Sequence, residues 1–534
     1  MTKFDELLTQ LGTGKWNLIY FISSGYWYFL LPSQTFNMMF YAPVVNYTCL
    51  PPEGENITQI SEDSCTYTVD RSSLAGLEEK HCTEWDFDTS VFTRTLTSEF
   101  GLVCQNSFLR PTFQSIYLFS TVFSSIITGY LADRYGRKIV VVVTLVVYSL
   151  VSLSISAVTN FNAILALRFI MGLLTNHCSY LLSMEVCEVR MRSVVGVLLG
   201  LPWALGMMAW GALAYLIRDW RWLQFTASLP MLLIIGFLFL IDESPRWLIV
   251  KGRHEQALKV LRRVARLNKS TLPPEEELRL MMSDIQAEFE ISKGASPMMD
   301  KETLNEKKRG SFKTPALLST SKMRLVIGIL ILNICTCSLV YCGLNFSGNN
   351  YSSDPFLFVV IGGLMEVPGH TLTSPIINRY GRKISIMIGL CICGAALLSL
   401  AFIPSDISWL VMTLAMIGKL TISGVLIIVI LYQTELIPTE VRMQGEATTG
   451  MMGQLASAAS PYLIDIPGPM RSWLPSTIFG VSSFLSALSL LTLPETRLMA
   501  MPDTINDLED VFSEKKKVGE EREVNGEAVD VNMS

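Results

Sequence analysis

Charged residues are scarce in this chain. Only 17% of its 534 residues are Asp, Glu, Lys or Arg, whereas 50% are hydrophobic, and the mean hydropathy is +0.39. A soluble domain of ordinary composition carries about 25% charged residues. The composition therefore excludes the ordinary soluble class and indicates a membrane protein.

Several other features are missing. The net charge is −5, and no basic region offers a binding surface for nucleic acid. The first residues, MTKFDELLTQLG, lack the basic start and the cleavage site of a signal peptide, so we expect the N-terminus to stay in the cytosol. We find no P-loop, zinc-ligand spacing or nucleophile elbow. We therefore expect no enzyme, no ATP-driven pump, no cofactor and no metal.

Long apolar runs are what the chain does have. A membrane-spanning helix needs about 20 mostly apolar residues, and this rule predicts twelve of them, six on each side of a polar block. The runs are 16–42, 111–131, 139–158, 162–186, 195–217, 222–241, 324–344, 356–377, 384–403, 408–435, 445–465 and 473–493. The predicted parts are an N-terminus (1–15), a first bundle (16–241) with a long loop (43–110), a polar block (242–323) of short amphipathic helices, a second bundle (324–493) and a disordered tail (494–534).

Basic residues in the short loops set the orientation. They follow runs two, four, eight and ten, so an even number of runs separates them and they share one side. The residues are Arg134, Arg137, Lys138, Arg190, Arg192, Arg379, Arg382, Lys383 and Arg442. The positive-inside rule assigns that side, and with it both termini, to the cytosol.

The loop 43–110 then lies outside the cell. It contains four cysteines, Cys49, Cys65, Cys82 and Cys104, and an even number in an exported loop predicts two disulfides with three possible connectivities. Two glycosylation sequons start at Asn46 and Asn56 in the same loop. The other seven cysteines lie in or beside apolar runs, where packing is the simpler interpretation.

A polar phrase occurs twice. LADRYGRK begins at Leu131 and IINRYGRK at Ile376, and two further landmarks recur in the same order about 250 residues apart. The paired landmarks are Glu185 and Arg192 with Glu435 and Arg442, and Glu243 and Arg246 with Glu495 and Arg497. Three repeats in register predict an all-α membrane protein of two pseudo-symmetric six-helix bundles. A site between such halves faces either side of the membrane as the halves rock.

The repeated phrases have a structural interpretation of their own. Gly136 and Gly381 permit sharp turns at equivalent places. Asp133 lies near helix N-termini that attract a carboxylate, so it could latch the two halves together. The simpler alternative, plain positive loops, explains neither the glycines nor the acid. We assign Arg168, Glu185, Arg192, Glu435 and Arg442 to a cytosolic charge network with a gating or structural role.

The chain resembles the major facilitator superfamily through Gly129-x-x-x-Asp133-Arg134-x-Gly136-Arg137-Lys138. CTEWDFD at Cys82, WRWLQ at Trp220, ESPRWL at Glu243, ELIPTEVR at Glu435 and LPETR at Leu493 are similar to phrases of the solute carrier family of organic cation, carnitine and organic anion transporters. The resemblance runs from the long loop to about residue 510. It implies polyspecific transport of small organic ions across the plasma membrane.

The chain departs from that family in three places. The family's long loop often has six cysteines, and this one has four. Asn378 stands in the second phrase where Asp133 stands in the first. The third departure is at the position twelve residues after Arg442. Family members that move cations resemble one another in having an Asp at this position, and those that move anions or carnitine tend to have an Arg. Here Gln454, a neutral amide, favours neither charge.

Polar residues inside apolar runs are the candidate substrate contacts. Lys419 could pair with a substrate carboxylate, and Glu366 could attract a cation or pair with Lys419. Tyr180 and Tyr341 resemble aromatic family positions that could hold a cation by its charge. The remaining candidates are His177, Asn37 and Gln454. For each, internal packing or pairing is the alternative interpretation.

The expected function is transport of small organic ions by alternating access, with cations or carnitine-like or amino-acid-derived zwitterions slightly favoured. Organic anions are the alternative substrates. A receptor or scaffold that kept the fold without transport is the alternative from another class. The partners are then the substrate and the lipid bilayer, with no nucleic acid.

Overall fold

The structure is a computed structural model. It describes residues 3–512 except 53–56, 62–63, 71–76, 176–181, 184, 189–190, 192–194, 197, 239, 295–316, 318–319, 353, 405–406, 467–472, 498, 500 and 511. The predicted sequon at Asn56 lies outside the described residues, whereas Asn46 is described and exposed.

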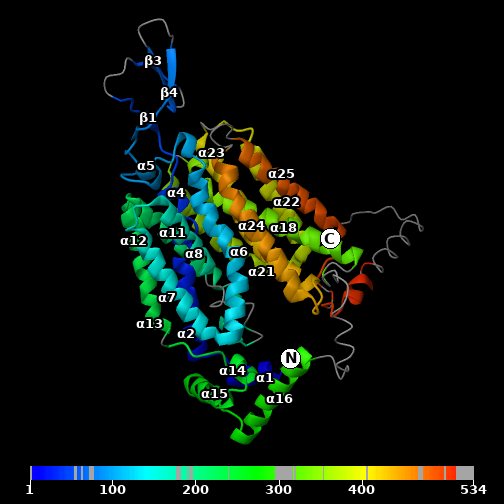
Figure 1. The fold of residues 1–534 in the computed structure, drawn as a ribbon. Helices are drawn as coiled ribbons and strands as arrows, with labels where there is room; N and C mark the ends of the chain where they lie inside the picture. Colours follow the sequence, from blue (N-terminus) through cyan, green and yellow to red (C-terminus); the bar gives the residue numbers. More distant parts are fainter. Residues whose placement is uncertain are drawn as a thin grey trace, which may run out of the picture.

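The helices form two bundles that stand side by side (Figure 1), and helical segments occupy all twelve predicted runs. The first bundle contains α2 (Lys15–Leu30), α3 (Pro32–Thr35), α4 (Met38–Tyr41), α6 (Leu109–Tyr135), α7 (Arg137–Ile155), α8 (Phe161–Leu173), α11 (Gly200–Leu216), α12 (Trp220–Ser228), η2 (Leu229–Leu233) and α13 (Ile234–Leu238). The second contains α18 (Ser321–Phe346), α19 (Gly348–Tyr351), α20 (Pro355–Thr371), α21 (Thr373–Tyr380), α22 (Arg382–Leu400), α23 (Ser408–Leu436), α24 (Arg442–Asp465), α25 (Trp473–Ser489) and η4 (Leu490–Thr492).

Seven helical stretches in the described residues are long and apolar enough to cross a membrane unbroken. Other runs are interrupted, and prolines mark two of the breaks. The first run is split into α2, α3 and α4, with Pro32 at the start of α3. The sixth run changes to the 3-10 helix η2 at Pro230 before α13.

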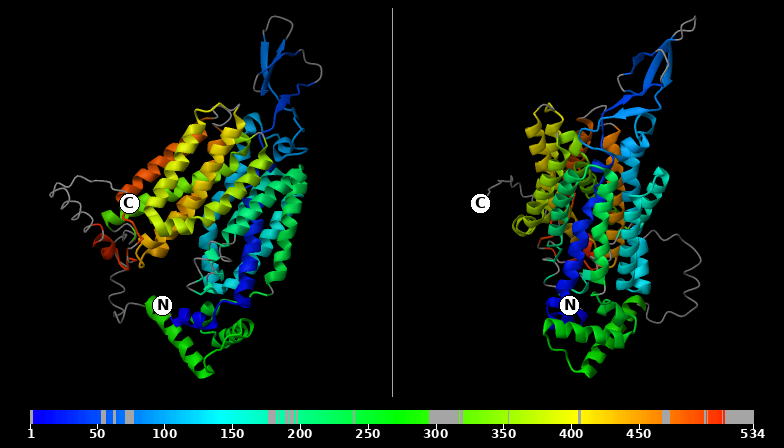
Figure 2. Two further views of the ribbon diagram at one scale, coloured as in Figure 1. Left: turned by 180° about the vertical axis from the view of Figure 1, so that it is seen from behind. Right: turned by 90° about the vertical axis from the view of Figure 1, so that its left-hand side faces the viewer.

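A small β module stands on one end of the bundles, which we call the strand end (Figure 2). β1 (Tyr47–Cys49) pairs antiparallel with β5 (Trp85–Phe87), while β2 (Ile57–Ile60), β3 (Thr66–Asp70) and β4 (Leu77–His81) form an antiparallel sheet. Of the three connectivities open from the sequence, the structure has Cys49–Cys82 and Cys65–Cys104. The 3-10 turn η1 (Cys104–Asn106) then leads into α6.

The opposite end carries helices that lie outside both bundles, and we call it the α15 end (Figure 1). α14 (Pro245–Val250), α15 (His254–Asn268) and α16 (Glu275–Gly294) bear out the amphipathic helices predicted for the polar block. The N-terminal helix α1 (Lys3–Leu11) buries Phe4 and Leu7 against them. Asn268 accepts a hydrogen bond from the backbone of Trp16, which ties α15 to the start of α2.

The tail is ordered further than the sequence predicted. Disorder was expected from residue 494, but Leu508 is only 1% exposed. The backbone N–H of Thr439 donates to the carbonyl of Pro502, and Lys322 donates to the carbonyl of Glu509. The segment around Pro502, Leu508 and Glu509 therefore packs on the α15 end of the second bundle, where the apolar side chain of Leu508 is buried.

Candidate functional site

A buried ion pair lies about midway along the second bundle. Glu366 on α20 and Lys419 on α23 are 0% and 1% exposed, and Lys419 Nζ lies 3.7 Å from Glu366 Oε1. Lys419 also donates a hydrogen bond of 2.8 Å to Asn345 Oδ1 on α18. Of the two roles left open for Glu366, the structure therefore shows the pairing with Lys419. An ion–carboxylate hydrogen bond is usually 2.7–2.9 Å long, so this pair is loose.

A chain of hydrogen bonds connects this pair to the other bundle. Tyr341 donates to Glu366 Oε1 at 2.9 Å, and Trp203 on α11 donates its indole N–H to the Tyr341 hydroxyl at 2.9 Å. Phe36, between α3 and α4, packs its ring edge-on against both aromatic rings. Tyr341 was predicted as a site residue, whereas Trp203 was not, because no local pattern distinguishes it from the other tryptophans. The two bundles thus share one polar site at mid-depth.

Gln454 also faces the partner bundle. It lies halfway along α24, and its Oε1 accepts a hydrogen bond of 3.1 Å from Thr121 on α6. A neutral amide thus occupies the contact between α6 and α24. The amide nitrogen of Gln454 can only donate hydrogen bonds, so it suits an acceptor group such as a carboxylate and not a cation.

Arg168 does not join the cytosolic charge network to which we assigned it. It lies on α8, is 1% exposed and donates to the Gln34 carbonyl, Asn37 Oδ1 and Gln114 Oε1. Asn37, predicted as a substrate contact, is 0% exposed and accepts a hydrogen bond from this arginine. The reason is tertiary: α3, α6 and α8 meet around position 168, which spacing along one helix cannot reveal.

The two repeated turns have the same construction. Gly136 and Gly381 have φ of +116° and +91°, the region that favours glycine. A Cβ on Gly136 would lie 2.3 Å from the Glu243 carboxylate, and one on Gly381 would lie 2.7 Å from the Glu495 carboxyl group. Glu243 accepts from the backbone of Lys138, and Glu495 from that of Lys383. The third repeated landmark therefore packs on the first, which explains why both recur together.

The second landmark completes each cluster. Arg137 contacts Glu185 at 3.2 Å in the first bundle, and Arg382 contacts Glu435 at 2.9 Å in the second. Arg442, assigned to the same network, donates to the carbonyl of Ile437 and to the hydroxyl of Thr439.

Asp133 pairs with Arg137, in its own bundle, so in this structure it is not a latch between halves. Arg134 contacts Tyr130, the Arg379 carbonyl accepts from Arg497, and Gly129 has open space beside it. Three predicted residues, His177, Tyr180 and Arg192, lie outside the described residues.

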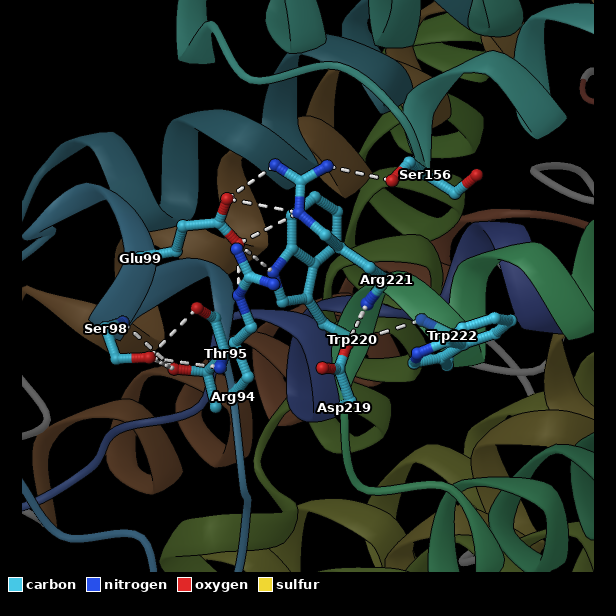
Figure 3. A network of polar contacts seen from close by, with 9 residues as sticks. All are labelled: Arg94, Thr95, Ser98, Glu99, Ser156, Asp219, Trp220, Arg221 and Trp222. Carbon is cyan, nitrogen blue, oxygen red and sulfur yellow. Dashed lines mark hydrogen bonds and ion pairs between the residues drawn. The ribbon is translucent and has the colours of Figure 1, made fainter.

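A second ionic network lies at the strand end (Figure 3), beside α5 (Leu96–Phe100). Glu99 accepts from Arg221 Nε at 3.1 Å and from the Trp220 indole at 2.8 Å, and it pairs with Arg94 at 3.0 Å. Burial favours a higher pKa for the Glu99 carboxyl group, but the hydrogen bonds from Arg221 and Trp220 and the charges of Arg221 and Arg94 hold the pKa below its ordinary value. WRWLQ is therefore the anchor that joins the segment below the β module to the first bundle.

The chain matches a known family over most of its length. Residues 78–500 match the family described as "Sugar (and other) transporter". The "Organic cation transporter protein" of Drosophila melanogaster is 30% identical over 497 residues, which cover 89% of this chain and 87% of that protein. "Organic anion transporter 3" of Oryctolagus cuniculus is 27% identical and covers 97% of this chain and 96% of its own.

The chain belongs to the solute carrier family of organic cation, carnitine and organic anion transporters. Its relatives are transporters and not enzymes, as the sequence predicted. The fold agrees: the "partially occluded inward open conformation of the xylose transporter XylE from E. coli" matches with a TM-score of 0.60 at 15% identity, covering 90% of this chain and 98% of that one. This is the major facilitator fold of twelve helices in two halves, embedded in a membrane.

Proposed function

We propose that this protein transports small organic ions across the plasma membrane by alternating access. The observation that supports the proposal is the buried site at mid-depth, where Glu366 and Lys419 are joined through Tyr341 to Trp203 of the other bundle. Ionisable groups at this depth are costly and usually mark a substrate path. A site shared by both halves is also where rocking of the halves changes access.

A zwitterion or a cation suits the loose pair. A substrate cation could replace Lys419 at Glu366, while a substrate carboxylate could pair with Lys419, and both contacts shorten if the substrate separates the two groups. Trp203 and Tyr341 add ring faces for a quaternary ammonium group. A membrane potential of 100 mV adds about 2.3 kcal/mol per positive charge in favour of accumulation inside.

We place the strand end outside the cell and the α15 end with both termini in the cytosol. The disulfide-bonded β module suits an oxidising compartment. The basic turns at Arg137 and Arg382 lie at the starts of α7 and α22, at the end of the bundles away from the β module, and positive loops favour the cytosol. The sequon at Asn46, exposed in that module, is our proposed glycosylation site.

Uptake of radiolabelled cationic, zwitterionic and anionic panels by cells expressing the chain tests the proposal. We expect Glu366→Gln to remove most cation uptake and Lys419→Ala to remove uptake of substrates with a carboxylate. Lys259→Ala, which changes an exposed lysine on α15, is the control. Surface biotinylation separates lost transport from lost expression. Correctly localised protein that moves no panel member would favour a receptor or scaffold, and unchanged uptake by Lys419→Ala would disprove the site.

Organic anions are the second candidate, favoured by one specific observation. Lys419 is neutralised by Glu366, but among the described residues no carboxylate forms an ion pair with the buried Arg168.

A further inference from the structure

The surroundings of Arg168 contain more hydrogen-bond donors than acceptors. Its Nη1 and Nη2 groups have neutral oxygen acceptors, but its Nε–H has no hydrogen-bond partner. Gln34 accepts from this guanidinium through its backbone carbonyl and Asn37 through its side-chain Oδ1, and the side-chain amide nitrogens of both residues also have no partner. The hydroxyl of Tyr41, whose charge interaction with Arg168 shows that it lies nearby, is likewise without a partner.

All four of these side chains are buried to at least 99%. Buried donors without acceptors are costly, because folding has removed the water that satisfied them. The charge is equally unusual: the rings of Phe113 and Tyr117 lie 4.6 and 4.5 Å from the guanidinium carbon, so aromatic faces stand where a carboxylate normally pairs with a buried arginine. An acceptor with a negative charge would satisfy these donors and balance the guanidinium charge.

The local fold keeps this position polar. The first run breaks after α3, so the carbonyl of Gln34 is free to accept from Arg168 instead of continuing a helix. Interrupted membrane helices often mark ion and substrate sites in transporters. Gln224 orients the Gln34 side chain by donating to its Oε1, so the amide nitrogen of Gln34 points away from Gln224.

We propose that Arg168, Gln34, Asn37 and Tyr41 form a binding site for a single negative charge in the first bundle. The ligand is a monovalent anionic group, either a free inorganic anion such as chloride or the carboxylate of a transported organic anion. The second source rests on the proposed function, but the first does not. The site is separate from the Glu366–Lys419 pair, which is already neutral.

Anion-dependent stability of the purified full chain in detergent tests the site without requiring transport. Thermal unfolding is followed while methanesulfonate is replaced by chloride, or by benzoate, at constant ionic strength and pH. A ligand that binds the folded state raises the melting midpoint by mass action, here by roughly 2 °C or more at saturation.

Two variants connect that shift to this site. Asn37→Asp places a carboxylate where Asn37 Oδ1 now lies 3.2 Å from Arg168 Nη2, so we expect it to supply the missing charge and to abolish the response to both anions. Arg168→Gln should abolish the response as well. Asn162→Asp, the same substitution at an exposed position on α8, is the control and should respond like wild type.

The outcomes are distinct. A response to chloride alone identifies a free inorganic ion, and a response to benzoate alone identifies a substrate carboxylate. If the protein transports no substrate but its melting midpoint still responds to chloride, the proposed function is wrong and the anion site remains supported. The site is overturned if wild type responds to neither anion, or if Arg168→Gln responds as wild type does.

Discussion

Arg110, near the start of α6, and Asp465, the last residue of α24, form an ion pair of 2.9 Å that joins the two bundles at the strand end. Their side chains are only 10% and 9% exposed. The hydroxyls of Thr112 and Tyr462 add a hydrogen bond of 2.8 Å beside them. Rocking of the halves that opens the strand end has to break both contacts.

Removing one partner should therefore favour opening at the strand end. Asp465→Asn leaves Arg110 buried without its carboxylate, which costs about 3 kcal/mol or more as long as that end is closed. We expect a cysteine introduced at Thr121 to react with an impermeant maleimide at least tenfold faster in this background. The exchanged pair Arg110→Asp with Asp465→Arg should restore slow labelling, and equal rates in all three would show that the ion pair closes nothing.

The two turn glycines should tolerate no side chain. Gly136→Ala and Gly381→Ala each place a Cβ against a glutamate carboxyl group and keep a positive φ, so we expect a loss of about 1–2 kcal/mol or more in stability. Gly129→Ala is the matched control in the same motif, since nothing lies within 4 Å and alanine favours a helix. Melting midpoints that fall equally in all three variants would contradict this explanation.

The disulfides should stabilise the β module and little else. Cys82→Ser frees Cys49 and is expected to cost about 2–5 kcal/mol in the local stability of the module. Cys391→Ser, at an exposed free cysteine, is the control. Peptide mapping without reduction should recover Cys49 linked to Cys82 and Cys65 linked to Cys104, and a different linkage would refute the observed connectivity.

Acid should loosen the Glu99 network. Because the folded state holds the Glu99 pKa below its ordinary value of 4.5, ionised Glu99 stabilises the fold above that pH, and this contribution disappears as the pH falls through the lower folded value. The protection of the α5 amides from hydrogen exchange, measured relative to the intrinsic exchange rate at each pH, should therefore decrease below about pH 4.5. Glu99→Gln should show faster exchange already at neutral pH and a weaker dependence on acid. A wild-type acid dependence that persists unchanged in this variant would assign the effect to other groups.

The sequence predicted the features that depend on local pattern. Twelve apolar runs became helical segments, and Gly136 and Gly381 became the turns that their repeated phrases indicated. The cysteines of the long loop paired with one another, as their even number suggested. Each of these follows from hydrophobicity, backbone conformation or count along one stretch of chain.

The sequence failed where the environment comes from distant segments. Arg168 was assigned by its position on a helix, but its partners come from α3 and α6, up to 134 residues away. Asp465 pairs with Arg110, 355 residues earlier, and nothing in the sequence near either residue points to the other. Glu435 pairs with Arg382, 53 residues earlier on the neighbouring helix α22. Tertiary packing decides such partners, and one sequence carries little record of it.

The attachment of WRWLQ to Glu99 has a practical consequence. The backbone of Trp220 donates to the carbonyl of Arg94, and Thr93 donates to that of Arg218, so the segment below the strands is fastened to the first half by main chain as well as by charge. A fluorophore attached to β3 should therefore move together with the first bundle. With a second dye at the strand end of α23, the distance between the two dyes would follow the movement of the two halves in single molecules in real time.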